Sequence, residues 1–220
     1  MGALVTKFFS RDEQEAIKAA VAEAEGGTSG EIVAYVVEQS DTYEEAEWRG
    51  GAFLGSLVVL GTILFHDVAT DWPSPLVAGT LLGGVVGFAI GMLLVKYVPP
   101  LTRIFTGRGI MERRVAARAA EAFVSEEVFN TRDRSGVLMF VSLLEHVVLV
   151  VGDSGITSRV GPDAWSGLVE TVLSGIRTGK PAEGLAAAVH QAGEILRKHG
   201  VDIRADDGNE LRDHLRLKRR

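Results

Sequence analysis

The sequence predicts an α/β protein in which helices cover both faces of a small sheet and a two-helix hairpin interrupts the domain. Segments with helical spacing alternate with short β-branched apolar runs, which is typical of a layered α/β domain. Two long charge-free runs lie in the middle of a chain that is otherwise rich in charge. Neither flanking piece has enough strands for a sheet of its own, so we expect the two pieces to fold together.

Composition narrows the class of protein. The chain has 220 residues, enough for one large or two small domains, and 46% of them are hydrophobic, as in folded proteins. Cysteine is absent, which excludes a disulfide framework, a thiolate nucleophile and a cysteine-based zinc site. The net charge of −6 gives no reason to expect nucleic acid as a partner.

The N-terminal piece predicts a helix, a strand and a second helix. Ser10 followed by Glu13 forms a capping box, and apolar residues then recur at helical spacing up to the glycines at 26–27. Residues 31–40 form a β-branched run too apolar to be exposed on both faces, so we expect a buried strand. Residues 41–50 look helical and continue into the first apolar run.

The two apolar runs predict a helical hairpin that crosses a membrane, over about 49–68 and 76–98. A helix rises about 1.5 Å per residue, so residues 76–95 span about 30 Å, one hydrocarbon core. Trp72 suits a membrane interface, and Pro73 and Pro75 separate the two helices. The alternative is a pair of buried core helices.

Glycines recur on one face of the second predicted span. Gly83, Gly87 and Gly91 are four residues apart, and such small faces let helices approach closely in lipid. The first span also carries small residues, so the two spans can pair with each other. A homodimer through the glycine-lined helix is a further expectation.

The charges that flank the spans predict their orientation. Arg49 precedes the first span, and Lys96, Arg103 and Arg108 follow the second, whereas the connecting loop has no Lys or Arg. Because positive charge stays on the cytoplasmic side, we expect an inner-membrane protein with two spans and both termini in the cytoplasm.

The C-terminal piece predicts a helix, a β-hairpin and two more helices. The helix covers residues 112–129, and the strands, 136–143 and 146–153, are joined by a tight turn at Leu144–Glu145. Pro162 and Pro181 stand just inside two helix starts, a position that proline favours. We therefore expect one discontinuous domain, 8–48 plus 104–202. The remaining residues, 203–220, are either a frayed polar tail or a basic helix on anionic headgroups.

Carboxylates near strand ends are the candidate ligands for Ca²⁺ or Mg²⁺. Glu38 and Asp41 follow the first strand, Asp153 follows the last, and Glu145 lies in the hairpin turn. If the first and last strands are parallel, then Glu38, Asp41 and Asp153 meet at one edge of the sheet and Glu145 lies at the other. The alternative is that all four are solvated turn residues.

Arginines near glycine-rich turns are candidates for binding phosphate or a lipid headgroup. Arg108 lies in TGRG, residues 106–109, before a helix, and Arg132 and Arg134 precede the first hairpin strand. Other chemistry is disfavoured. The GDSG run at 152–155 lacks the strands of a chymotrypsin-type protease, and no two of the five histidines have zinc-ligand spacing.

The run RSGVLMFVSLLEHVVLVVGDSGITSRVGPDAW, residues 134–165, resembles the TPM domain family, in particular its bacterial membrane-bound branch. Residues 30–49, GEIVAYVVEQSDTYEEAEWR, are similar to the N-terminal strand and helix of that branch. The resemblance implies an α/β/α sandwich. It also implies relatives that assist photosystem II repair or an acetylcholine receptor, some of them credited with phosphatase activity and divalent-metal binding.

The chain departs from the metal-linked pattern of that family at two places. The pattern has Asp-Asn before the Gly-Val-Leu strand and Asp-Arg in the hairpin turn, where this chain has Arg134-Ser135 and Glu145-His146. A cation in place of a ligand carboxylate repels a metal ion. We therefore expect a non-catalytic, membrane-anchored binding or assembly module without a cofactor, and the alternative is a metal-dependent phosphatase. A pore is disfavoured because the apolar runs of the two spans, 50–65 and 76–95, contain no charged residue.

Overall fold

The computed structural model describes residues 8–69, 75–201 and 210–218. The chain divides into two compact units, one made of Met1–Asp41 and Glu112–Arg220, and the other of Thr42–Met111. We call these the α/β unit and the hairpin unit. Trp72 and the last two arginines lie outside the described residues.

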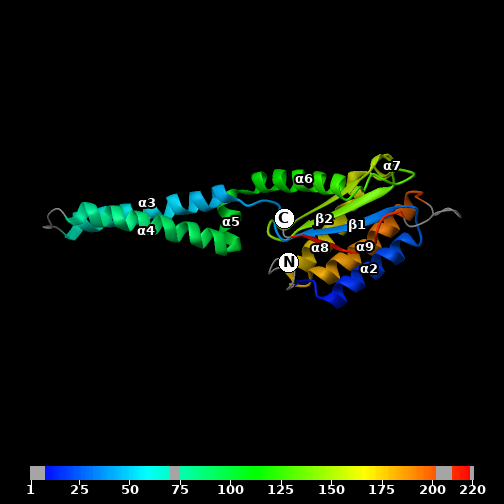
Figure 1. The fold of residues 1–220 in the computed structure, drawn as a ribbon, viewed down its shortest axis with the longest axis horizontal. Coiled ribbons are helices and arrows are strands. Elements are labelled where there is room, and N and C mark those ends of the chain that lie inside the picture. The colour runs from blue at the N-terminus through cyan, green and yellow to red at the C-terminus, as the bar shows by residue number, and fades with distance from the viewer. Residues whose placement is uncertain (1–7, 70–74, 202–209, 219–220) are drawn as a thin grey trace. The chain divides into compact units, whose positions relative to one another are not determined.

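The α/β unit is built on a four-stranded mixed sheet in the order β3-β2-β1-β4 (Figure 1). Strand β1 (Glu31–Val37) is parallel to β2 (Gly136–Ser142), with Glu31 opposite Gly136 and Val37 opposite Ser142. Strand β3 (Val147–Gly152) is antiparallel to β2, as the predicted β-hairpin requires. Both β1 and β2 are buried along their whole length, which explains their continuous apolar sequences.

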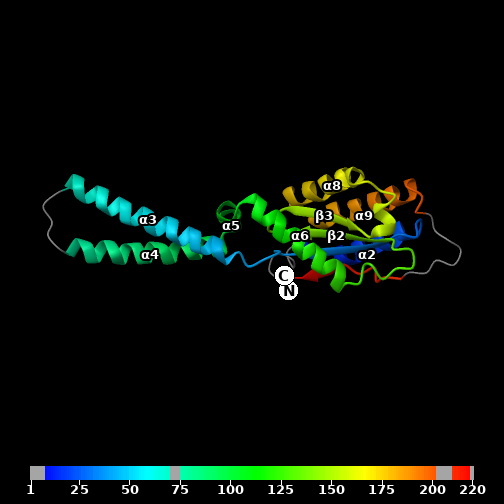
Figure 2. The same ribbon diagram turned by 90° about the horizontal axis from the view of Figure 1, so that it is seen from above.

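Helices cover both faces of this sheet (Figures 1 and 2). On one face, α2 (Arg11–Glu25), α8 (Ser166–Arg177) and α9 (Pro181–Lys198) pack on alternate residues of the strands, such as Val36 and Met139. The other face is covered by α6 (Arg108–Ser125), which packs on residues such as Tyr35 and Phe140. The short α7 (Ser154–Thr157) and the 3₁₀ helix η1 (Pro162–Trp165) connect β3 to α8. The α/β class with helices on both faces is confirmed.

The predicted signals at helix starts are also present. The side chain of Ser10 accepts a hydrogen bond from the amide of Glu13, and the Glu13 carboxylate accepts one from the amide of Ser10. Pro181 occupies the first position of α9. These local signals fix where α2 and α9 begin, and the buried face of each helix then packs on the sheet.

The C-terminal segment differs from both expectations for it. Residues 216–218 form β4 (Arg216–Lys218), which pairs in parallel with β1, Tyr35 opposite Arg216 and Val37 opposite Lys218. The tail is therefore neither frayed nor helical in its described part. The guanidinium of Arg216 is only 6% exposed and pairs with Glu126, so it is not available to a lipid surface.

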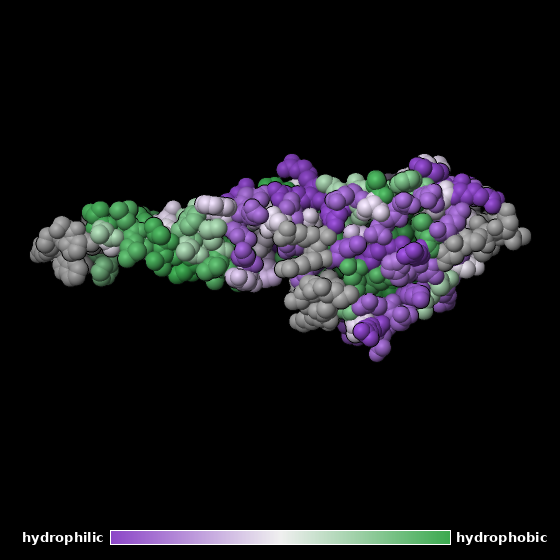
Figure 3. All heavy atoms as spheres, in the orientation of Figure 1, coloured by the Kyte–Doolittle hydropathy of each residue, from purple (hydrophilic) through white to green (hydrophobic). Residues whose placement is uncertain are grey.

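The hairpin unit consists of α3 (Glu44–Ala69), α4 (Pro75–Tyr97) and the short α5 (Pro99–Thr106). By length and composition, α3 and α4 can each cross a membrane. Only 17% and 11% of their most apolar windows are buried within the chain. Figure 3 accordingly shows mostly hydrophobic residues on the surface of these helices and mostly hydrophilic residues on the visible face of the α/β unit.

Glycine lets α3 and α4 pack closely. A Cβ atom on Gly91 would lie 2.4 Å from the carbonyl oxygen of Gly50, and one on Gly87 would lie 2.9 Å from a methyl group of Val58. A Cβ on Gly83 would only touch Val58, at 3.4 Å. The predicted small-residue face is therefore used inside the hairpin, against α3, and a second copy would have to use another face.

Helix α5 was not predicted from the sequence. Pro99 and Pro100 start the helix, and Gly107, at φ 84°, follows its end. The guanidinium of Arg49 donates hydrogen bonds to the carbonyl oxygens of Phe105 and Thr106, which satisfies the last turn of α5.

Candidate functional site

The four candidate carboxylates are divided between the two ends of the sheet, and not in the predicted way. Because β3 is antiparallel to β2 and β1 is parallel to it, the end of β3 lies beside the start of β2. The amide of Asp153 accordingly donates to the carbonyl oxygen of Gly136 at 2.9 Å. The prediction required β1 to be parallel to the second strand of the β-hairpin, which is β3. This condition is not met. Asp153 is therefore apart from Glu38 and Asp41, and it is Glu145 that lies at their end.

Two serines and Glu145 form a buried hydrogen-bonded group where β1 and β2 end. The amide of Ser40 donates to Oε1 of Glu145 at 2.7 Å, and the hydroxyl of Ser142 donates to Oε2 of the same carboxylate. The hydroxyls of Ser40 and Ser142 lie 2.8 Å apart. Both carboxylate oxygens of Glu145 therefore accept hydrogen bonds from protein groups. These bonds connect the turn after β2 to the segment after β1.

Glu38 and Asp41 lie beside this group and also have protein partners. The amide of Leu144 donates to the carbonyl oxygen of Glu38 at 2.9 Å, so the main chain after β1 bonds the β2–β3 turn. The carboxylate of Asp41 forms an ion pair with Arg114 of α6 at 2.5 Å. The carboxylates of Glu145 and Asp41 are thus held by an amide, a hydroxyl and a guanidinium, and Glu38 bonds the turn through its main chain.

At the opposite end, Asp153 is paired with Arg134. Nε of Arg134 lies 2.9 Å from Oδ2 of Asp153, whose side chain is only 5% exposed. Oδ1 of the same carboxylate accepts the amide hydrogen of Ser154 and so caps α7. Arg134 adopts a φ of 55° and also lies over the ring of Phe129, 5.8 Å from its centre. A fixed guanidinium therefore occupies one side of the carboxylate that the metal hypothesis needs.

The other two candidate arginines are placed differently. The main-chain amide of Arg132 donates to the carboxylate of Glu210, at 3.1 and 3.3 Å from its two oxygens. Arg108 is exposed and is the first residue of α6.

A cluster of acidic residues beside the start of β1 escaped the sequence analysis. The carboxylate of Glu25 accepts the amide hydrogen of Ile32 at 2.8 Å, and that of Glu31 accepts those of Glu210 and Leu211. Burial raises the pKa of Glu25 to about 8, against the lowering effect of the Ile32 amide, and the nearby charges of Glu31 and Asp213 add to the rise. Burial also raises the pKa of Glu31. The only sequence signal was a charged residue at each end of a glycine-rich turn.

Within the described ranges, no group of three or more His, Asp or Glu side chains is arranged to hold a metal ion. The polar groups of the α/β unit instead bond mainly to other protein groups. Ser40, Ser142 and Glu145 close one end, Arg134 and Asp153 close the other, and Glu25 and Glu31 bind main-chain amides.

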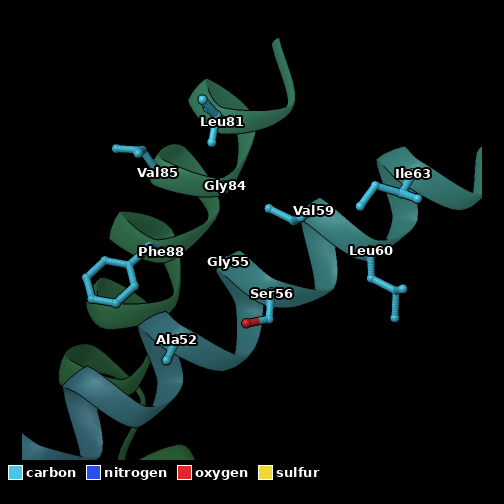
Figure 4. A pocket seen from close by; sticks show the side chains of 10 residues that line it. All are labelled: Ala52, Gly55, Ser56, Val59, Leu60, Ile63, Leu81, Gly84, Val85 and Phe88. Carbon is cyan, nitrogen blue, oxygen red and sulfur yellow. The ribbon is translucent and has the colours of Figure 1, made fainter. Parts of the chain in front are cut away.

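The hairpin unit contains a shallow groove of about 580 Å³ between α3 and α4 (Figure 4). Gly55 and Gly84 face each other beside it, and Val59 and Phe88 line its sides. Its lining is apolar apart from the hydroxyl of Ser56. The groove therefore offers apolar contact only, and it contains no titratable group.

The fold and its polar clusters together define a mixed α/β domain with an inserted apolar hairpin. Among solved structures, this chain is similar to the BA42 protein from the psychrophilic bacterium Bizionia argentinensis, whose structure was determined by NMR. The similarity has a TM-score of 0.58 and 19% sequence identity, and it covers 97% of each chain. At this identity it shows a shared fold. No family model matches the chain, and no curated protein matches it.

Proposed function

We propose that this chain is a membrane-anchored TPM-like module that binds another membrane protein and has no catalytic activity of its own. The observation that carries this choice is the ion pair between Arg134 and Asp153. A guanidinium fixed 2.9 Å from the buried carboxylate supplies the positive charge that a divalent cation would otherwise bring. Phosphoryl transfer needs positioned cations, and among the described residues no group of three or more His, Asp or Glu side chains is arranged to hold a metal ion.

The exposed apolar surface of α3 and α4 supports the membrane anchor. Monomeric soluble proteins rarely expose large contiguous apolar patches, and here residues such as Leu81, Leu82 and Val85 are about two-thirds exposed. With both spans in the bilayer, the two ends of the hairpin emerge on the same side. The arginines and Lys96 at those ends favour the cytoplasmic side of the inner membrane, with both termini there.

Titration calorimetry tests the choice between a module and a metal-dependent phosphatase. The full-length protein in detergent is titrated with Ca²⁺ and Mg²⁺, and p-nitrophenyl phosphate is used as a phosphatase substrate. We expect neither binding heat nor turnover. Tight binding together with turnover that disappears in Glu145→Ala or Asp153→Ala would establish the phosphatase instead.

A matched variant isolates the role of Arg134. Arg134→Asp removes the cation and restores an acid at this position, and aspartate tolerates the positive φ that Arg134 adopts. Two carboxylates would then face each other, and we expect the variant to bind Ca²⁺ where the natural chain does not. Arg177→Ala, which breaks an exposed ion pair with Glu170, is the control and is expected to bind no Ca²⁺. Partner binding itself is tested by crosslinking in native membranes.

A further inference from the structure

The outer edge of β1 is only partly covered by the C-terminal segment, residues 210–218. Strand β4 pairs with three residues of β1, Tyr35 to Val37, whereas β2 pairs with all seven on the other side. The ladder continues one step further, because the amide of Glu38 donates to the carbonyl oxygen of Lys218 at 3.1 Å. Such a short strand makes few main-chain hydrogen bonds to β1, so most of its contacts with the unit are made by side chains.

The same edge continues past β4, where Glu25 takes the place of a strand. Successive amides of β1 point alternately to its two sides, so the amide of Ile32 points to the same side as that of Glu38. It is bound by Oε1 of Glu25, 2.8 Å away, instead of a strand carbonyl. Oε2 of Glu25 is buried without a hydrogen-bond partner in the described part of the chain. A longer strand would replace this carboxylate with a carbonyl oxygen.

Side chains of the C-terminal segment show what the edge selects. Leu215 is buried in the core and Leu217 packs against the same cluster. Between them, Arg216 pairs with Glu126 at 3.2 Å, and Lys218 lies 3.9 Å from the same carboxylate. An extended segment with alternating apolar and basic residues therefore meets two apolar positions and one acidic position on the unit.

The resident segment binds Glu31 through the amides of Glu210 and Leu211, but two of its own acidic side chains lie near the same buried carboxyl groups. Asp213 and Glu210 place negative charge near Glu31, and Asp213 places it near Glu25. Burial is the main cause of the raised pKa of both carboxyl groups, and these side-chain charges add to the rise, whereas the amides of Glu210 and Leu211 lower the pKa of Glu31 and Arg216 lowers that of Glu25. A segment with neutral or basic residues at these two positions would bind the same edge without this repulsion.

We propose that the outer edge of β1 is a strand-acceptor site, which β4 occupies in the absence of a partner and which takes up an extended apolar–basic segment of a partner protein. Strand addition gives affinity through the main chain and specificity through alternate side-chain pockets. Here the specificity comes from the two apolar positions where Leu215 and Leu217 pack and from the carboxylate of Glu126. This proposal rests on the proposed function as a binding module, and it names the surface that does the binding.

A reversible disulfide between β1 and β4, called the lock below, tests whether another segment can replace β4. The chain has no cysteine, so Val36→Cys combined with Leu217→Cys introduces one pair, at positions directly opposite in the β1–β4 register. The probe is a fluorescent peptide with the sequence of residues 210–218, added to the full-length protein in detergent. We expect the reduced variant to bind the peptide and the oxidised variant to bind it at least tenfold more weakly. Equal binding in the two states overturns the proposal, and circular dichroism confirms that both states are folded.

Peptide variants test the recognition chemistry. A peptide with Glu210→Gln and Asp213→Asn is expected to bind at least threefold more tightly than the natural sequence, because it lacks the repulsive charges. A peptide with Arg216→Ala is expected to lose at least tenfold in affinity, because Glu126 is left without its partner. If all three peptides bind alike, the edge does not select this chemistry and the proposal fails.

Crosslinking in native membranes separates this proposal from the proposed function. With the lock reduced, we expect crosslinks to a specific membrane protein, and with the lock oxidised we expect at least a tenfold loss of them. Crosslinks that are equally abundant in both states leave the module intact but refute the β1 edge as its docking site. The absence of specific crosslinks in either state refutes the proposed function itself.

Discussion

The α3–α4 hairpin and the α2–α9 pair bring helices together in the same way but present opposite outer faces. In the hairpin, a Cβ on Gly91 would meet the main chain of Gly50. In the α/β unit, a Cβ on Gly193 of α9 would lie 2.9 Å from the Cβ of Ala24 of α2. Both pairs therefore need a residue without a side chain where their axes approach.

The faces that point away from these contacts differ. Helix α9 buries its leucines and presents residues such as Glu183, Glu194 and Arg197 to the outside. Helix α4 presents Leu82 and Leu93, which are 64% and 53% exposed. A contact face of small residues therefore does not show whether a helix pair is surrounded by water or by lipid. The composition of the outer face is more informative: that of α9 is charged, and that of α4 is apolar enough to lie in lipid.

The largest expected effect comes from charging the outer face of α4. Leu82→Arg combined with Val86→Arg places two guanidinium groups near the middle of this helix. Each costs about 2.5–3.5 kcal/mol at the centre of a membrane span, so we expect the double variant to lose its membrane association. The measurement is the fraction of protein that stays in the membrane pellet after alkaline carbonate extraction.

The matched change on α9 is Ala187→Arg, at an exposed position of a helix that we assign to water. It should leave the pellet fraction unchanged. The free energy of unfolding should stay within about 0.5 kcal/mol of that of the natural chain. If the natural chain itself appears in the carbonate supernatant, or if the charged α4 variant pellets as well as the natural chain, the lipid assignment is wrong.

The next effect concerns the contact face of the hairpin. Gly91→Leu forces a side chain against the main chain of Gly50, and overpacking of this kind costs about 1–3 kcal/mol. Gly79→Leu is the matched control, because a Cβ at Gly79 meets nothing within 4 Å. We expect the first variant to separate α3 from α4 and the second to leave them paired.

An engineered cysteine pair reports this separation. Val58→Cys and Gly83→Cys lie across the contact, since a Cβ on Gly83 would be 3.4 Å from a methyl group of Val58. Oxidation to a disulfide should be rapid in the parent and in the Gly79→Leu background, and slow in the Gly91→Leu background. Equal rates in both backgrounds would mean that the glycine face does not hold the hairpin together.

Local patterns predicted most of the fold. The capping box of Ser10, the continuous apolar strands and the hairpin turn at Leu144–Glu145 are each encoded within a few residues, and the structure contains them. Strand β4 escaped prediction because three residues are too short for a period to be visible. Its pairing with Tyr35–Val37 links positions about 180 residues apart, and sequence spacing carries no information on such contacts.

The candidate site was predicted less well, because strand direction decides which residues meet. Glu38 and Asp41 were expected beside Asp153, but β3 runs antiparallel and places Asp153 at the other end of the sheet. The interpretation of Arg134 as a cation in a ligand position fits its ion pair with Asp153. The burial of Glu25 and Glu31 had no local signal, since it depends on how the C-terminal segment packs.

The stability of the two regions should depend differently on pH. The α/β unit has buried carboxyl groups, and the α3–α4 contact has none among the described residues. The pKa of Glu25 is about 8 in the folded protein and near 4.5 when unfolded. A raised carboxyl pKa contributes stability that is present at low pH and is lost as the pH rises through 8. Between pH 6.5 and 8 we expect the α/β unit to lose about 1–2 kcal/mol after allowance for solvent screening. Thermal unfolding followed by circular dichroism measures this loss.

Two other titratable groups also affect the stability of the α/β unit in this pH range. The raised pKa of Glu31 acts in the same direction as that of Glu25, again because of burial. Burial lowers the pKa of His214, whose contribution is lost as the pH falls below about 6.5, so it opposes the trend only at the acidic end. Glu25→Gln keeps an acceptor for the Ile32 amide and should flatten the profile above pH 6.5. An unchanged slope in this variant would show that Glu25 is not its source.

The smallest expected effect is at a helix end in water. Ser10→Ala removes the hydroxyl that accepts the Glu13 amide hydrogen, and α2 then begins with an unsatisfied donor. Loss of such a cap costs about 0.5–1 kcal/mol, which lowers the melting temperature of a unit of this size by about 2–4 °C. Ser174→Ala, an exposed serine inside α8, is the control and should change the melting temperature by less. Because this cap acts on α2 alone, disulfide formation between cysteines at 58 and 83 should stay unchanged, and a slower rate would mean that the two helix pairs do not fold independently.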